Sequence, residues 1–184
     1  PVAAAAAPAA AQGGGGMKRV PSFSTRPCFP AGLKVLLMEE DRELLDRNKA
    51  LLDECHYDVR TATSRADALR VLRASSVDDF DVALISGKGA DTSQGQKVMD
   101  AARAKQIPVV LIGEPDDDTF VVKGIKLGAA QVLTRPLQTF QVAKLWHHAV
   151  RAMVKRRTQA VPGVLPHGRA GAPAPAASLA ASCG

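Results

Sequence analysis

The chain has 184 residues, 46% of them hydrophobic, which is enough for one ordinary domain with a core but not comfortably for two. No apolar run approaches the roughly 18 to 20 residues that a membrane helix needs, so no membrane span is expected. The N-terminal alanine tract comes before the charges Lys18 and Arg19 rather than after them, which excludes a typical secretory signal. The chain starts at Pro1, with its first methionine at Met17, which fits a fragment or a product processed upstream.

The formal net charge of +6 belongs to the flanks of the chain. All 18 acidic residues lie between Glu39 and Asp118, whereas seven of the 24 cations lie outside the span 33–154, so that span is nearly neutral. A basic patch for direct nucleic-acid binding is therefore not expected on the folded part. The run Lys155-Arg156-Arg157 fits half of a nuclear import signal or a cation-rich helix end, and both interpretations stay open.

The three cysteines, Cys28, Cys55 and Cys183, are scattered along the chain. None is paired at metal-ligand spacing, and no Cys-x-x-Cys motif occurs. A reducing intracellular compartment is the simplest interpretation.

The two ends of the chain differ in composition from its middle. Residues 1–31 and 158–184 are rich in Ala, Gly and Pro and contain few large apolar residues, which predicts disorder because ordering them would bury little surface. One folded domain is therefore predicted at residues 32–157.

The first half of this domain alternates between strand and helix patterns. The apolar run 33–38 suits a strand buried on both faces of a parallel sheet. In the helix predicted at 41–55, apolar residues recur on one face. A short alternating strand follows at 57–62, and Ser64 is expected to be the N-cap of the next helix.

Three more strand–helix pairs follow in the second half. In chain order they are predicted at 82–85, 95–104, 109–112, 116–128, 131–133 and 138–157. The last is expected to be one helix, with Val142, Leu145, Trp146, Ala149 and Met153 facing inward.

Five βα units with short connections predict an α/β fold: a doubly wound, five-stranded parallel sheet with helices on both faces. In such sheets the sites form beyond the carboxyl ends of the strands. The candidate site residues are therefore those at strand ends: Glu39, Glu40, Ser86, Gly113, Thr134 and Arg135.

A nucleotide-binding loop does not fit the glycines after the third predicted strand. Gly87-Lys88-Gly89 follows a strand, but Thr92 stands where the dinucleotide fingerprint needs its third glycine. The fingerprint also belongs after the first strand rather than the third. No P-loop motif occurs anywhere in the chain, so nucleotide binding is not expected.

Serine-hydrolase chemistry does not fit Ser86 either. A nucleophile elbow needs glycine two residues before and two after the serine, and Leu84 and Lys88 occupy those positions. The candidate bases His56, His147 and His148 are predicted on helices or their ends, away from this rim.

Three acidic residues, Glu39, Glu40 and Asp41, end the first strand. Carboxylates this close repel one another unless a metal ion or a basic side chain compensates, and oxygen ligands suit Mg²⁺. Alternatively, Asp41 caps the following helix and the two glutamates are solvated. The residues alone leave both interpretations open.

Taken together, the strand-end residues match a known pattern. An acidic cluster ends the first strand, a short residue the third, a small residue the fourth, and a basic residue followed by proline the fifth. This resembles the receiver domain of two-component response regulators, over about 33–154. The phrases VVKGIKLGAAQVLTRPL and KLWHHAVRAMVKRR resemble in particular the plant type-B and pseudo-response-regulator branch. The resemblance implies a flavodoxin/CheY-like (βα)5 fold.

The resemblance also implies a site. In the family, an aspartate ending the third strand accepts a phosphoryl group from a phosphohistidine, and an acid pair ending the first strand helps to hold Mg²⁺. A Thr or Ser ending the fourth strand and a Lys ending the fifth sense the phosphate. On this chain the acid pair corresponds to Glu39 and Glu40, the phosphoacceptor to Ser86, the hydroxyl switch to Gly113, the aromatic switch to Val132 and the lysine to Arg135.

These replacements predict a site without its chemistry. Aspartyl phosphate needs a carboxylate nucleophile, and a serine hydroxyl needs a nearby base. Ser86 also removes one anionic Mg²⁺ ligand, and Gly113 has no hydroxyl. Arg135 is expected to neutralise Glu39, Glu40 and Asp41 instead. No catalytic residue, resident cofactor or metal is therefore predicted.

The resulting hypothesis is a pseudo-receiver, a protein-interaction module rather than an enzyme. Its expected partners are phosphotransfer proteins or response regulators in plant cytokinin-type or clock-type signalling, in the nucleus or also the cytoplasm. The expected contact surface is that of the last two helices and the fifth strand. A transcriptional role would need a DNA-binding domain in a missing C-terminal part. The alternative is a phosphorylatable regulator that uses Asp91 or Ser86 with Mg²⁺.

Overall fold

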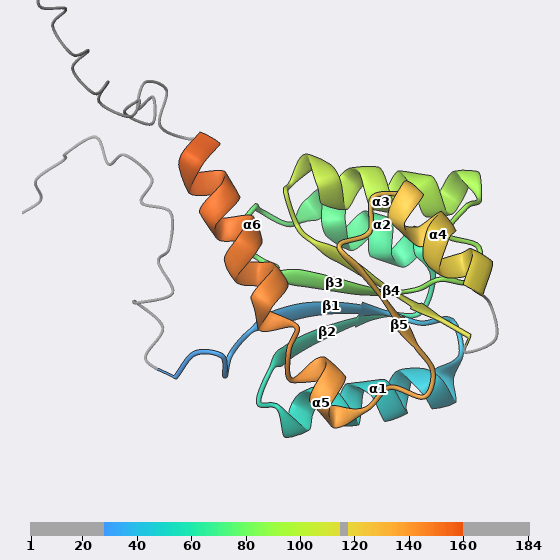
Figure 1. Cartoon of the computed structure of the whole chain (residues 1–184), viewed down its shortest axis with the longest axis horizontal. Helices are drawn as coiled ribbons and strands as arrows, with labels where there is room; N and C mark the ends of the chain where they lie inside the picture. Colours follow the sequence, from blue (N-terminus) through green and yellow to red (C-terminus); the bar gives the residue numbers. More distant parts are fainter. Residues whose placement is uncertain (1–27, 115–117, 160–184) are drawn as a thin grey trace, which may run out of the picture.

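The computed structural model describes residues 28–114 and 118–159, and its strands form one parallel sheet in the order β2-β1-β3-β4-β5 (Figure 1). The strands are β1 (Lys34–Met38), β2 (Asp58–Ala62), β3 (Val82–Ser86), β4 (Val109–Gly113) and β5 (Gln131–Thr134). The helices are α1 (Arg42–Glu54), α2 (Arg65–Ala74), α3 (Ser93–Ala104), α4 (Asp118–Lys126), α5 (Thr139–Val142) and α6 (Trp146–Gln159). The predicted doubly wound sheet is confirmed.

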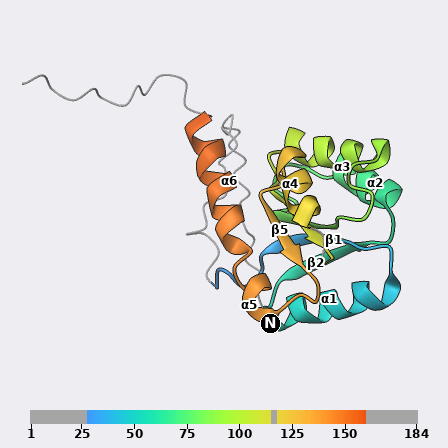
Figure 2. The ribbon, with the colours of Figure 1, turned by 45° about the vertical axis from the view of Figure 1, so that its right-hand side comes forward.

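Helices cover both faces of the sheet: α1 and α5 lie on one face, and α2, α3 and α4 on the other (Figures 1 and 2). Successive side chains of β1 point to opposite faces of the sheet and pack in the hydrophobic core on each face. Leu36 and Met38 belong to the core beneath α2 and α3, whereas Val35 and Leu37 belong to the core beneath α1 and α5. Strands β3 and β4 are buried at every position, as their continuous apolar runs predict.

Local capping explains where several helices begin. The Asp41 carboxylate accepts hydrogen bonds from the amides of Glu43 and Leu44, at 2.9 and 3.2 Å. The predicted N-cap at Ser64 is confirmed, since its hydroxyl accepts from the Asp67 amide at 3.1 Å. These caps place each helix start directly after a strand end, which fixes the loops that carry the candidate site.

The prediction of one continuous helix at 138–157 is wrong. The chain turns at residues 143–145 and resumes as α6. The Tyr57 hydroxyl, at the start of β2, donates to the backbone carbonyls of Val142 and Ala143, each at 3.2 Å. Leu145 N–H then bonds to the Val142 carbonyl in a tighter turn, at 3.1 Å. The break thus coincides with these contacts from Tyr57, directly before β2, and no Gly or Pro in residues 138–157 predicts it.

After this break, α6 crosses the ends at which the strands begin, here called the amino edge of the sheet (Figure 1). His148 Nε2 lies 2.6 Å from Gln131 Oε1 at the start of β5. Gln159 accepts from Gln106 before β4 at 2.9 Å, and Arg156 donates to the Val77 carbonyl before β3 at 3.2 Å. The opposite ends of the strands form the carboxyl edge, which α6 leaves uncovered.

The predicted flanking segments lie almost wholly outside the described residues. Residues 28–31, at the end of the first, form a turn in which the Phe29 ring meets Trp146 edge-on at 5.9 Å. Cys183 and the predicted helix start at 116–117 also lie outside the described part of the chain. Among the described residues, no helix combines the length and apolar character needed to cross a bilayer.

Candidate functional site at the carboxyl edge of the sheet

The fold brings the strand-end candidates together at the carboxyl edge. Glu39 follows β1, Ser86 ends β3, Gly113 ends β4 and Arg135 follows β5. Because β1, β3, β4 and β5 are successive neighbours in a parallel sheet, their ends meet along one line. The predicted meeting of these residues, which are far apart in sequence, therefore follows from the topology.

Arg135 is the centre of this arrangement. Its Nη2 donates to Glu39 Oε2 at 2.5 Å and to Ser86 Oγ at 3.1 Å. Its Nε lies 3.4 Å from Glu114 Oε1, which is an ion pair without a hydrogen bond. The Glu39 side chain is only 4% exposed, so the guanidinium supplies the positive charge that a buried carboxylate requires.

The three acids that end β1 have three separate partners. Glu39 pairs with Arg135, as the sequence predicts, and its second oxygen accepts from the Glu40 amide at 3.1 Å. Glu40 pairs instead with Arg65 at the start of α2, and Asp41 caps α1. Arg135 therefore neutralises one of the three acids rather than all of them. The alternative in which Asp41 is a cap is correct, but Glu39 is buried rather than solvated.

Arg65 was not anticipated from the sequence. Besides its pairing with Glu40, its guanidinium lies against the loop after β3, where a Cβ built on Gly89 would be 3.1 Å from Nη2. Arg65 Nε and Nη2 are buried without a hydrogen-bond partner in the structure. Little in the sequence predicts the pairing of Arg65 with Glu40, because α2 belongs to a different βα unit from the acids that end β1.

Phe120 is the second residue that sequence reasoning missed. A Cβ built on Gly113 would lie 2.1 Å from Phe120 Cδ1, and one built on Gly87 would lie 1.9 Å from Phe120 Cζ. The ring of this α4 residue therefore occupies the space directly over the ends of β3 and β4. Neither glycine has a positive φ, so close approach rather than backbone conformation explains why both lack a side chain.

A cavity of about 280 Å³ remains beside the Phe120 ring. It is lined by the 87–91 loop on one side and by Glu114, Lys123 and Arg135 on the other. Asp91, the alternative phosphoacceptor, is exposed and lines this cavity. Ser86 is buried, accepts from Arg135 and is not among the lining residues of this cavity.

Val132, at the position of the family's aromatic switch, is half-buried against α4. A Cβ built on Gly124 would lie 2.7 Å from Val132 Cγ2, so the two backbones approach closely here. The described part of the chain therefore has an aromatic ring over this site from α4, at Phe120, and an aliphatic residue in β5.

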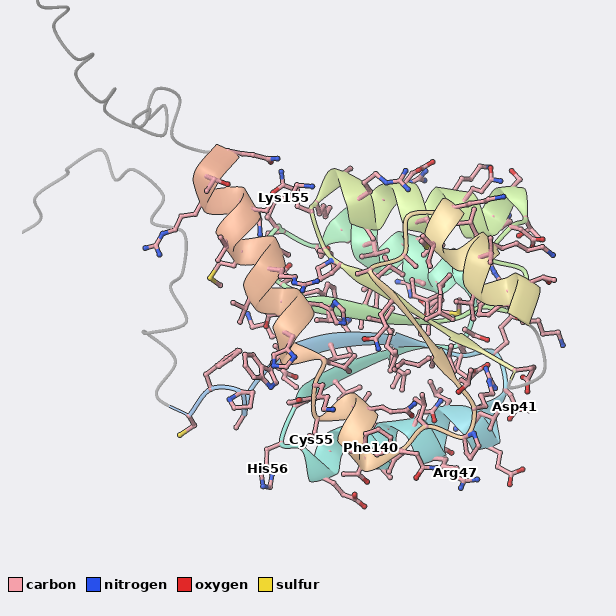
Figure 3. The ribbon with its side chains drawn as sticks, in the orientation of Figure 1. Asp41, Arg47, Cys55, His56, Phe140 and Lys155 are labelled. Carbon is pink, nitrogen blue, oxygen red and sulfur yellow. The ribbon has the colours of Figure 1, made fainter. Side chains whose placement is uncertain are left out.

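The histidines lie away from Ser86, as predicted. His56 is exposed after α1 (Figure 3), and His147 and His148 lie on α6 at the amino edge. The Ser86 hydroxyl accepts from a guanidinium, and the nearby Glu39 carboxylate is held by the same guanidinium. Within the described residues, this arrangement offers Ser86 no group placed to remove its proton.

The acid pair does not fit a resident Mg²⁺ as it is arranged. Arg135 and Arg65 each take one glutamate, and the remaining position, Ser86, brings a neutral hydroxyl where the family has a carboxylate. In the described ranges, no group of three or more His, Cys, Asp and Glu side chains is placed to hold a metal ion. Mg²⁺ would have to displace two arginines, so no chemistry is assigned to it here.

Several solved structures with this architecture are described as receiver domains or response regulators. A response regulator receiver domain protein from Clostridium thermocellum superposes with a TM-score of 0.56 at 19% identity, over 69% of this chain and 98% of that one. Full-length FixJ from B. japonicum gives a TM-score of 0.59 at 18% identity, over 71% and 64%. This chain has the CheY-like receiver fold. The predicted fold class is thus confirmed.

The curated relatives of this receiver-fold chain are plant proteins. Two-component response regulator ARR10 of Arabidopsis thaliana is 31% identical over 124 residues, which are 67% of this chain and 22% of the relative. Two-component response regulator ORR23 of Oryza sativa is 30% identical over 142 residues, 77% of this chain and 20% of the relative. The chain therefore spans about a fifth of the length of these relatives. No protein-family model matches it.

Proposed function

We propose that this chain is a pseudo-receiver, a receiver-fold module that recognises other proteins of a phosphorelay without accepting a phosphoryl group itself. Its homology to plant two-component response regulators supports the signalling context. The single observation that carries the loss of chemistry is the contact of Ser86 with Arg135, at 3.1 Å, where the family has a free carboxylate. Phe120 supports it by filling the space above the same strand ends.

The proposed contact surface consists of α4, β5 and the last two helices. Five large apolar side chains are exposed on these elements: Val121, Val122 and Ile125 on α4, Phe140 on α5 and Val154 on α6. Ile125 and Phe140 are each more than 60% exposed. Exposed large apolar side chains are a feature of protein contact sites when they form a patch. The proposed partners are phosphotransfer proteins or other response regulators, acting in cytokinin-type or clock-type signalling in the nucleus or the cytoplasm. A role in transcription would depend on a further domain of the whole protein.

Phosphorylation by a small-molecule donor tests the loss of chemistry directly. The chain is incubated with acetyl phosphate and Mg²⁺, and its intact mass is recorded before and after acid and base treatment. No phosphoryl adduct is expected on the natural sequence. The variant Ser86→Asp/Arg135→Lys/Phe120→Ala restores the carboxylate and the lysine and removes the ring, so it is expected to gain a base-labile adduct. A stoichiometric adduct on the natural chain would overturn the proposal.

One observation favours the alternative acceptor strongly enough to test. Asp91 lines the same cavity as Lys88, Lys123 and Arg135, so it has cations nearby. If an adduct forms on the natural chain and disappears in Asp91→Asn but not in Ser86→Ala, the chain is a phosphorylatable regulator with a displaced acceptor. The reverse pattern would assign the reaction to Ser86.

The recognition role needs its own measurement. Immobilised chain is exposed to purified plant phosphotransfer proteins and response regulators, and binding is measured by interferometry. Ile125→Asp and Phe140→Asp are expected to abolish binding, because each places a charge in the proposed contact surface. Ala50→Asp, which places the same charge at an exposed position of α1 outside that surface, is the matched control. Equal loss in all three variants would contradict the assigned surface.

A further inference from the structure

A cavity at the amino edge has no role in the phosphoryl chemistry considered above. It measures about 500 Å³ and lies between α6, the end of α3 and the segments that lead into β4 and β5. This volume is in the range of small-molecule sites. We refer to it as the α6 groove. It is at the opposite edge of the sheet from Ser86 and Arg135, so neither its existence nor its occupancy depends on the phosphorylation site.

The floor of the α6 groove is apolar. Met99, Ile107 and Val109 are buried side chains of the core beneath α3, and half-buried Pro108 lies between the last two. These residues come from α3 and the start of β4, which are fixed by the sheet. An apolar group placed here would exchange water for contact with the exposed parts of these apolar side chains.

The rim of the groove is cationic. Arg103 from α3 and Arg151 and Lys155 from α6 line it, and no Asp or Glu is among the lining residues. Figure 3 places Lys155 on the side of α6 toward α3. Arg151 and Lys155 are both exposed and line the groove, and neither forms an ion pair with another residue of the ranges 28–114 and 118–159.

Arg103 is held in place before any ligand arrives. Its Nη2 donates to the Leu127 carbonyl at 2.8 Å, and its Nη1 pairs with Asp100 at 2.8 Å. Its guanidinium lies so close to Gly128 that a Cβ there would be 2.6 Å from Nη2, and Gly128 has a positive φ of 85°. A pre-positioned guanidinium loses little conformational freedom on binding an anion.

The pKa of His148 depends on the charges around the groove. It lines the groove beside Arg151, and burial, the Arg151 charge and His147 lower the pKa of its imidazole. An anion in the groove would oppose the contribution of Arg151 and move that pKa upward. His148 therefore provides a spectroscopic readout independent of affinity.

We propose that the α6 groove binds a small amphipathic anion, a flat apolar body that carries a phosphate or carboxylate. The apolar floor accepts the body, and Arg103, Arg151 and Lys155 take the charge. Phosphate and carboxylate share the chemistry that three cations recognise, and the preference between them is a result of the test. This site is additional to the protein-recognition role of the receiver fold.

The test uses the full chain, labelled with ¹⁵N, and 1-naphthyl phosphate as the probe. Saturable shifts are expected at the backbone amides of Gly128 and Ala152 and at the side-chain amide of Gln106, together with a rise in the pKa of His148. Inorganic phosphate and neutral 1-naphthol, each lacking half of the probe, are expected to bind at least about tenfold more weakly. Titration with 1-naphthoate then compares carboxylate with phosphate.

A charge-matched pair of variants separates the groove from net charge. Arg151→Gln/Lys155→Gln is expected to weaken probe binding at least about tenfold. Arg42→Gln/Arg47→Gln removes the same charge from α1, where both side chains are exposed, and is expected to leave binding unchanged. Equal losses in the two variants, shifts confined to α4 and Phe140, or equal binding of inorganic phosphate and the probe would each overturn the proposal.

Discussion

The two edges of the sheet have opposite character. At the carboxyl edge, Arg135 donates to Glu39 and Ser86, and the Phe120 ring lies over two strand ends beside a cavity of about 280 Å³. At the amino edge, α6 leaves an open groove with cations around an apolar floor. The difference teaches that one receiver fold can tie its strand ends together with internal contacts at one edge while leaving an open, cation-lined groove at the other, which is the basis of the two proposals above. Four measurements would break or sharpen this comparison.

The largest effect is expected for Arg135→Ala. It leaves the buried Glu39 carboxylate without a cation, which should lower the free energy of unfolding by about 3–5 kcal/mol in urea denaturation. Lys49→Ala, which breaks a half-exposed pair with Asp53, should cost at most about 1 kcal/mol. Glu39→Gln/Arg135→Met should recover most of the loss. If Arg135→Ala lowers the free energy of unfolding no more than Lys49→Ala does, the pair of Arg135 with Glu39 does not stabilise the carboxyl edge.

The next effect concerns the contact of Phe120 with Gly113. Gly113→Thr restores the family's hydroxyl residue but places a Cβ against the ring, so it should lower stability by about 1–3 kcal/mol. In a Phe120→Ala background the same change should cost clearly less, giving a coupling energy measurable by a double-mutant cycle. Additive effects in that cycle would show that the ring does not occupy the space over Gly113.

A smaller effect is expected for Tyr57→Phe, which tests the break between α5 and α6. Loss of the hydroxyl bonds to Val142 and Ala143 should cost about 1 kcal/mol. Burial raises the pKa of Tyr57 to about 12 from its ordinary value of 10.0. The folded state thus keeps a proton that the unfolded state loses, so Tyr57 makes stability fall as pH rises from 10 to 12. The curves of unfolding free energy against pH for the natural chain and for Tyr57→Phe should approach each other between pH 10 and 12. Parallel curves would contradict the raised pKa of Tyr57.

The smallest effect is the titration of His148, followed by NMR. Its pKa should lie below the ordinary value of 6.5, because burial and Arg151 disfavour the imidazolium. Arg151→Gln should raise it, whereas Arg47→Gln on α1 should not. The folded state is the weaker proton binder, so this histidine stabilises the fold above pH 6.5 and less as pH falls below it. An unchanged pKa in Arg151→Gln would contradict a cationic groove.

Much of the fold could be predicted from the sequence, because it depends on local patterns. Short apolar runs gave the strands, and Ser64 gave a helix start by capping chemistry alone. The meeting of Glu39 with Arg135 could also be predicted, since parallel topology brings strand ends together whatever their separation in sequence. The charges of the two side chains and the parallel topology were sufficient to predict this contact.

The features that escaped prediction depend on contacts between distant segments. The helix breaks after Val142, whose carbonyl accepts from Tyr57, 85 residues earlier, and no Gly or Pro near Val142 marks the break. Arg65 pairs with Glu40 from a different βα unit. The Phe120 ring occupies the space that side chains at Gly87 and Gly113 would take. Such partners are chosen by three-dimensional shape, so periodicity and capping rules could not identify them.

The link between Arg135 and Glu39 also affects how the domain opens. It ties the end of edge strand β5 to the end of β1, across β4 and β3. Detaching β5 alone would leave the buried Glu39 carboxylate without a counter-charge. Local opening of this edge should therefore involve β3 and β4, which lie between β1 and β5. Amide hydrogen exchange would then report β1 and β5 as one cooperative unit, even though an edge strand ordinarily frays first.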